Sequence, residues 1–322
     1  MRTTMKPLMR LLTVSAAVAA TTQLMADHGP GTSGGGASTQ SGETLRPGKF
    51  SIDLRTDYTE FENLSATQIE AKAARAGGFD LLDRSFLSTV GVSYGVVEDF
   101  QVGLTLGYYH AVNAREAEFD GVDTEILTFD PDGLTDLWLT GKYRFYRGPI
   151  GSLAVFGGAK FPTGKFDVKN SAGERVEPSA TAGSGSYDGM GGAAYSRFLT
   201  SRITLDASGQ YTFRTEADDF RLGDRIDAGL ALAYRFTEDI QKFPQFGIFG
   251  EANLRHLFKS EEDGEDDPNT GGSALFLTPG VRAGFNRNIS FTVSAPLPVW
   301  QDLNGTQLKT SYKVNGALTF TF

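Results

Sequence analysis

Cysteine is absent from the 322 residues of the chain. Disulfide bonds are therefore excluded, and so is a lipid anchor attached to a cysteine at the start of a mature chain. An exported protein without disulfides needs another source of stability, such as a large core or a closed sheet. Long apolar runs are also missing after residue 26, where no stretch reaches about 18 apolar residues, so the sequence predicts no transmembrane helix.

Basic residues are outnumbered, with 30 Lys and Arg against 39 Asp and Glu, and the formal net charge is −9. No basic cluster of the kind that nucleic-acid binders carry occurs, so we expect no nucleic-acid partner. Histidine is scarce, at three residues. His110 and His256 fall near the ends of predicted strands, without a pairing motif for catalysis. We expect no enzymatic activity, no cofactor and no metal site, and the acidic stretch 260–270 lacks the carboxylate spacing of an EF-hand loop.

The N-terminus has the layout of a secretory signal peptide. Arg2, Lys6 and Arg10 precede a short apolar core at residues 11–20, and small residues follow up to Ala26. We predict a signal peptide over residues 1–26, with cleavage after Ala26, or after Ala20 as second choice. A disordered basic N-terminus is the alternative. Cleavage would remove three basic residues and take the net charge to −12.

Residues 27–48 (DHGPGTSGGGASTQSGETLRPG) are rich in Gly, Ser and Thr and have no apolar period. This composition predicts a flexible N-terminal segment before the folded domain, which we place at residues 49–322.

From Phe50 onward, apolar and polar residues alternate with a period of two. The clearest case is residues 203–214 (ITLDASGQYTFR), where Ile203, Leu205 and Tyr211 share one face. Successive side chains of a strand point to opposite faces, so each such segment predicts a strand with one apolar face. About twelve segments follow this pattern, beginning near Phe50, Arg84, Phe100, Gly133, Ser152, Ser186, Ile203, Arg225, Phe246, Ser273, Ile289 and Gln307.

The length of these segments and their connections indicate a membrane barrel. Most are about ten to fourteen residues long, whereas an oblique bilayer crossing takes about nine to eleven residues and soluble strands about five or six. Short connections such as 97–99 and 286–288 alternate with longer polar ones such as 113–132 and 163–185. Aromatic residues gather near both ends of the segments. These features predict an all-β transmembrane antiparallel barrel of about 12 strands, with both ends in the periplasm. A soluble β-protein is the alternative, and residues 66–76 form a helix candidate in the first long loop.

The polar faces of a membrane barrel line its interior. We therefore expect a lumen with charges of both signs, which either pair to fill the space or form a constriction that selects solutes. A barrel of about twelve strands lies between filled eight-stranded barrels and open sixteen-stranded pores. The candidate residues along the solute path are Asp136, Trp138, Lys142, Arg144, Lys160, Asp206, Arg225, Asp227, Arg235, Glu251, Arg255, Arg282 and Lys313.

Aromatic residues and two prolines also fall on the predicted lumen face. They form either an apolar stretch for a hydrophobic or aromatic solute or the packing of a plugged barrel. Pro296 and Pro298 point to an irregularity in their strand. The aromatic positions are Tyr109, Trp138, Phe156, Phe249, Phe276 and Trp300.

Residues 156–165 (FGGAKFPTGK) resemble the G-x-K-x-P-T-G signature of outer-membrane barrels named for the MetA pathway of phenol degradation. Residues 134–145 and 183–197 are similar to the flanking strands of that family, and the resemblance extends over residues 87–322. The terminal Phe322 resembles the signal read by the barrel-assembly machinery. The resemblance implies passage of small, often aromatic or hydrophobic compounds, and no catalytic residues.

We therefore expect a channel or transporter in a bacterial outer membrane, through which small organic compounds diffuse. Its partners would be outer-membrane lipid, a small solute and the barrel-assembly machinery. Two alternatives are a structural or surface-interaction barrel that transports nothing and an outer-membrane hydrolase.

Overall fold

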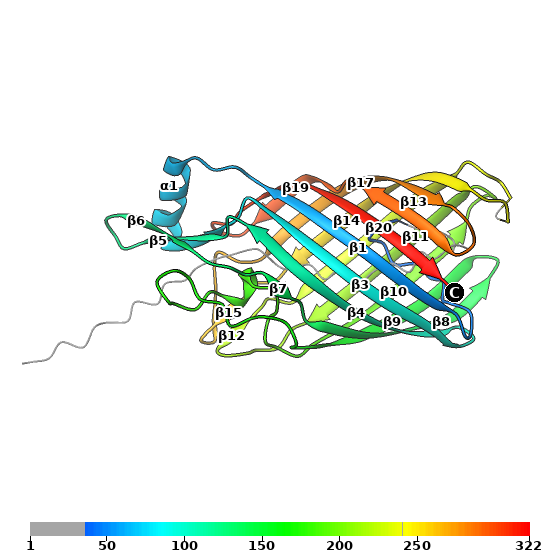
Figure 1. Cartoon of the computed structure of the whole chain (residues 1–322), viewed down its shortest axis with the longest axis horizontal. Coiled ribbons are helices and arrows are strands. Elements are labelled where there is room, and N and C mark those ends of the chain that lie inside the picture. Colours follow the sequence, from blue (N-terminus) through cyan, green and yellow to red (C-terminus); the bar gives the residue numbers. More distant parts are fainter. Residues whose placement is uncertain (1–35, 240) are drawn as a thin grey trace, which may run out of the picture.

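Twelve antiparallel wall strands close into a barrel in the computed structural model, which describes residues 36–239 and 241–322 (Figure 1). Each strand pairs with its neighbours along the chain, and β1 pairs with β20 to close the ring. The predicted fold class, strand number and alternation are confirmed. The wall consists of β1 (Phe50–Phe61), β3 (Arg84–Val97), β4 (Phe100–Val112), β7 (Gly133–Leu134) with β8 (Leu137–Gly148), β9 (Gly151–Phe161), β10 (Asp188–Phe198), β11 (Ile203–Phe213), β13 (Arg225–Arg235), β14 (Gln245–Leu257), β17 (Gly272–Gly284), β18 (Ile289–Ser294) with β19 (Leu297–Leu303), and β20 (Thr310–Thr321).

The wall has an apolar outside and a polar inside. In β13, Leu230 and Leu232 are exposed by more than half, whereas Arg225 on the opposite face is 2% exposed. Asp206 on β11 has no exposed surface. This inverts the pattern of a soluble protein, because the outer face of a membrane barrel contacts lipid and its strands pair with one another around the ring. In the described part of the chain, no helix has the length and apolar character needed to cross a membrane.

The two ends of the barrel differ. Short turns and the C-terminus lie at one end, and the long loops with α1 (Ala66–Ala76) lie at the other (Figure 1). The long loops carry two small sheets and a short 3-10 helix: β2 (Gly78–Leu81), β5 (Arg115–Phe119) and β6 (Thr124–Thr128); β12 (Phe220–Arg221), β15 (Glu261–Glu262) and β16 (Glu265–Asp266); and η1 (Pro178–Ala180).

Helix α1 begins and ends where its sequence dictates. Ser65 caps the first turn, and Gln68 completes a reciprocal capping box. Gly77 ends the helix at a positive φ of 87°, which glycine adopts without strain. Ala73 packs beneath the helix against Phe79. The predicted helix at residues 66–76 is thus confirmed.

The strand that contains Pro296 is interrupted. β18 pairs with both β17 and β20, whereas β19 continues along β17 with a register shift between Leu275 and Phe276. This irregularity turns Trp300 outward, where it is 47% exposed, so its predicted lumen position is wrong. A strict period of two fails wherever one strand contains an extra residue.

Residues 36–47, here called the lumen segment, lie inside the ring. Most of residues 36–45 are buried, and Thr39 and Ser41 have no exposed surface. The expectation of a flexible segment over residues 27–48 is therefore wrong for this part, because backbone groups of a Gly/Ser-rich chain bond to polar wall residues. The predicted signal peptide at 1–26, its cleavage sites and residues 27–35 lie outside the described residues.

Candidate solute path in the barrel lumen

The predicted lumen residues lie on the inner face of the wall, in three groups. Arg235 differs from the rest: it lies at the short-turn end, where its guanidinium donates to the carbonyls of Thr237 and Ser201. Buried positions are Asp136, Trp138, Lys142, Arg144, Lys160, Asp206, Arg225 and Glu251, and half-buried positions are Asp227, Arg255, Arg282 and Lys313.

One group holds the first half of the lumen segment. The carboxylate of Glu251 accepts hydrogen bonds from the backbone N–H groups of Ala37, Ser38 and Thr39, at 3.0 Å for Thr39. Arg282 donates to the carbonyl of Gly36 at 3.3 Å. A carboxylate that accepts several backbone N–H bonds fixes the course of the chain without a regular element.

The second half of the lumen segment is held by Glu43. Its carboxylate pairs with Arg144 and accepts from Ser152 Oγ at 2.6 Å, and its carbonyl accepts from Lys142 Nζ at 3.1 Å. Leu45 N donates to Gln101 Oε1 at 2.7 Å. Four of the predicted lumen residues thus bind the lumen segment.

Small polar wall residues complete the contact between the lumen segment and the wall. Sequence reasoning did not identify them as site residues. The hydroxyls of Ser41 and Ser196 lie 3.0 Å apart, Gly42 N donates to Ser196 Oγ at 2.8 Å, and Ser196 also bonds Asp206. Gln40 N donates to Ser208 Oγ at 3.0 Å. The available signal was three small or polar residues on inner faces, Ser196 of β10 and Ser208 and Gln210 of β11.

A second group anchors the loop between β9 and β10, residues 162–187, here called the mouth loop. Lys160 Nζ lies 3.2 Å from Asp136 Oδ2 and 2.5 Å from Asp188 Oδ2. Asp136 also accepts from the backbone N–H groups of Gly164 and Ser184, at 2.9 and 3.0 Å. These bonds hold both ends of the mouth loop against the inner wall.

The family-like signature therefore has a structural meaning. Its Lys160 forms the ion pairs, and its Gly164 lies so close to Gly183 that an added Cβ would come 2.8 Å from Gly183 Cα. Thr163 Oγ1 accepts from Leu137 N at 3.0 Å. The signature thus fixes the point where the wall ends and the mouth loop turns inward, and the buried helix η1 follows on that loop.

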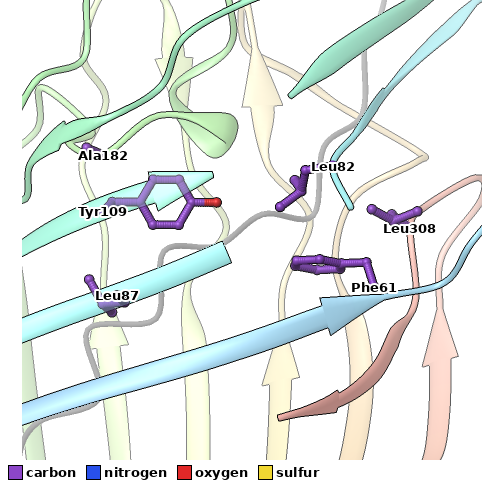
Figure 2. Close-up of a cluster of buried hydrophobic side chains, with 6 residues drawn as sticks. All are labelled: Phe61, Leu82, Leu87, Tyr109, Ala182 and Leu308. Carbon is purple, nitrogen blue, oxygen red and sulfur yellow. The ribbon is translucent and has the colours of Figure 1, made fainter. Parts of the chain in front are cut away.

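An apolar cluster lies at the long-loop end of the lumen, and we call it the outer cluster. In Figure 2 the Tyr109 ring lies near Leu87 and Ala182, and its hydroxyl points toward Leu82. Side chains from the wall strands β1, β3 and β4, from the first long loop, from the mouth loop and from the last long loop meet here. The outer cluster consists of Phe61, Leu82, Leu87, Tyr109, Ala182 and Leu308.

The third group surrounds a cavity between the lumen segment and the opposite wall, here called the central cavity. Asp227 pairs with Arg225 at 2.6 Å and with Arg255 at 2.9 Å. The Lys313 ammonium lies 5.3 Å from the centre of the Phe276 ring. Further lining residues are Ser38, Gln40, Ser208, Gln210, Asn253 and Pro296.

The two histidines of interest lie near the long-loop end. His110 contacts Asp132, and His256 Nδ1 lies 2.8 Å from Ser273 Oγ. Asp302 of β19 lies opposite Ser273 of β17. His256 is on β14, so Asp302 does not lie opposite it. Within the described ranges, no three His, Cys, Asp or Glu residues are grouped so as to hold a metal ion.

Comparison with known proteins gives one family and a shared fold. The family model described as "Putative MetA-pathway of phenol degradation" matches residues 28–302. The COG4313 outer membrane channel from Pseudomonas putida F1 superposes with a TM-score of 0.61 at 12% identity, covering 87% of this chain and 97% of that one. The NanC porin gives a TM-score of 0.47 at 9% identity, covering 84% and 98%. No curated protein gives a sequence match.

Proposed function

Because the chain belongs to the MetA-pathway family of phenol degradation, we propose that it is an outer-membrane channel for the inward diffusion of small organic compounds. The observation that carries this proposal is the central cavity inside the barrel wall, which is lined by polar groups and Phe276. Ligand sites typically combine such an apolar surface with a few placed polar groups.

The chemistry along the lumen favours compounds with an apolar or aromatic part. A solute that enters from the long-loop end meets the outer cluster first and the ring of Phe276 next. Aromatic side chains offer flat apolar surface to a ring-shaped solute. Water-filled pores for sugars or ions would not need an apolar cluster at their mouth.

Passage requires the lumen segment to move. It occupies the region between the central cavity and the short-turn end, where Glu43 and Leu45 bond to the wall. Its contacts are mostly hydrogen bonds to Ser, Gln and charged groups, which water can replace at a modest net cost of about 1 kcal/mol each. The lumen segment thus acts as a displaceable plug.

Two other functions fit the structure less well. A hydrolase triad needs one histidine that contacts both a serine and an acid, but in the described residues His110 contacts Asp132 and His256 contacts Ser273. A purely structural barrel would not need a cavity that contains several charged side chains.

Conductance in planar bilayers and swelling of proteoliposomes test the proposed channel function. We expect the purified full chain to give small, discrete conductance steps in planar bilayers, and benzyl alcohol to interrupt the current as it occupies the central cavity. Proteoliposomes should swell in a neutral aromatic glycoside faster than liposomes without protein. A silent bilayer together with unchanged swelling would contradict a channel. Unchanged hydrolysis of lipids and esters in both His110→Ala and His256→Ala would remove the hydrolase alternative.

A further inference from the structure

The central cavity has an excess of positive charge. Arg225 and Arg255 share the single carboxylate of Asp227, at 2.6 and 2.9 Å, and their side chains are only 3% and 14% exposed. Lys313 adds a third cation to the same lining. One carboxylate cannot neutralise three cations, and the low-dielectric wall of a barrel strengthens the resulting field.

Lys313 is the cation with the fewest anionic contacts. Among the residues that the structure describes, no carboxylate forms an ion pair with its ammonium, which instead lies over the Phe276 ring. Asp57, a nearby acid, is already paired with Arg55 at 2.8 Å. A desolvated ammonium without a paired anion is costly, so an incoming anion gains from contact with it.

The geometry of the lining selects a particular kind of anion. A guanidinium matches the two oxygens of a carboxylate, and an ammonium adds a point charge beside it. Phe276 and Pro296 supply an apolar surface next to these groups, and Ser208 and Gln210 supply further polar contacts. A small molecule with a ring and an acid group fits both parts of the cavity.

We propose that the central cavity binds small aromatic carboxylates, with Lys313 and Arg255 contacting the carboxylate and Phe276 contacting the ring. The inference rests on the proposed channel function and narrows its solute class to organic acids. Neutral ring compounds lose the charge contacts, and aromatic amines are repelled by the same cations.

Isothermal titration of the full chain in neutral detergent tests this site, with benzoate, benzyl alcohol and benzylamine as probes. Benzoate should bind at least about tenfold more tightly than benzyl alcohol, and benzylamine should not bind. Cyclohexanecarboxylate should bind more weakly than benzoate, because it lacks the aromatic face. Binding in detergent is measured whether or not a solute crosses a membrane. A negative binding result would therefore contradict the aromatic-carboxylate site without contradicting the channel, which the conductance and swelling measurements test separately.

The matched variants are Lys313→Met and Lys309→Met. Lys313→Met should lower benzoate affinity about tenfold and leave benzyl alcohol binding unchanged, since one charge contact is lost. Lys309, exposed just before β20, should tolerate the same change without effect. If Lys313→Met does not fold, as judged by heat-modifiable migration, Lys313→Gln replaces it. Equal affinity for benzoate and benzyl alcohol, absent benzoate binding, or an unaltered affinity in the folded Lys313 variant would overturn the proposal.

Discussion

At the scale of single residues, the lumen charges are best understood by their partners. Sequence alternation identified Lys160, Glu251 and Arg255 as lumen residues, and the structure places them there. The alternation could not predict the partners of these residues, because an ion pair between strands depends on strand register. The partner of Glu251 is the lumen segment, which has no periodic pattern. The residue types were predictable, whereas the networks were not.

The ion pairs of Lys160 make the first prediction. Lys160→Met leaves Asp136 and Asp188 buried without their cation, which should cost about 3 kcal/mol of mouth-loop docking. Limited proteolysis should therefore cut within residues 162–187 much faster than in the unaltered chain. Lys169→Met, at an exposed position of the same loop, is the control and should leave the cutting rate unchanged.

Carboxyl groups in the outer loops predict a dependence on pH. Burial, together with repulsion from Glu116 and Glu174, raises the pKa of Glu118 to about 7, and burial raises the pKa of Asp80 and Glu177 well above their usual range. A raised carboxyl pKa means that the docked state binds the proton more tightly than the undocked state. The resulting stability is complete below pH 4.5 and is lost as the pH rises through about 7.

We therefore expect the long loops to become more accessible to protease between about pH 5 and pH 8, with rates normalised to an unstructured peptide. Glu118→Gln keeps a neutral side chain at all pH values and should weaken this dependence, while Asp80 and Glu177 still titrate. Equal loop protection at both pH values in the unaltered chain would show that these carboxyls do not couple to loop docking.

At the scale of elements, strand alternation and helix signals were sufficient for most of the wall. The starts of most long strands and the bounds of α1 follow from local patterns, since Ser65 and Gly77 mark the helix ends. The strands predicted near Ser186 and Gln307 begin later, at Asp188 and Thr310, because the preceding residues belong to long loops. The exceptions share one cause. Trp300 lies beyond a register shift, and the lumen segment has no side-chain pattern at all, so only tertiary contacts decide their positions.

The lumen segment gives an element-scale prediction. Glu251→Ala removes the acceptor for the N–H groups of residues 37–39, so residues 36–39 should leave the wall more often. The mean single-channel conductance should rise several-fold, because the plug is open for longer. Glu98→Ala, at an exposed position of a short turn, removes the same charge without touching the lumen segment and should conduct like the unaltered chain.

At the scale of the whole molecule, the closed ring accounts for both stability and composition. Strand β1 meets β20 over most of its length, which satisfies the backbone at the point where an open sheet would have edges. Charged residues concentrate inside, so the mean hydropathy is only −0.23 in a chain whose outer face contacts lipid. The absence of cysteine is consistent with stability that derives from closure.

Closure predicts heat-modifiable migration. The folded chain should run faster on a gel when it is not boiled, because detergent at room temperature does not open a ring without edges. Identical migration of boiled and unboiled samples after correct refolding would argue against a closed barrel.

The central claim is that solutes pass through the lumen when the lumen segment moves, and a reversible tether tests it most directly. The hydroxyls of Ser41 and Ser196 lie 3.0 Å apart in a chain without cysteine, so Ser41→Cys with Ser196→Cys can form a single disulfide. We predict that the oxidised protein conducts very little and that a reductant raises its conductance to at least that of the unaltered chain, because the variant also lacks the hydroxyls of Ser41 and Ser196. Equal conductance before and after reduction, with the disulfide verified, would contradict the account.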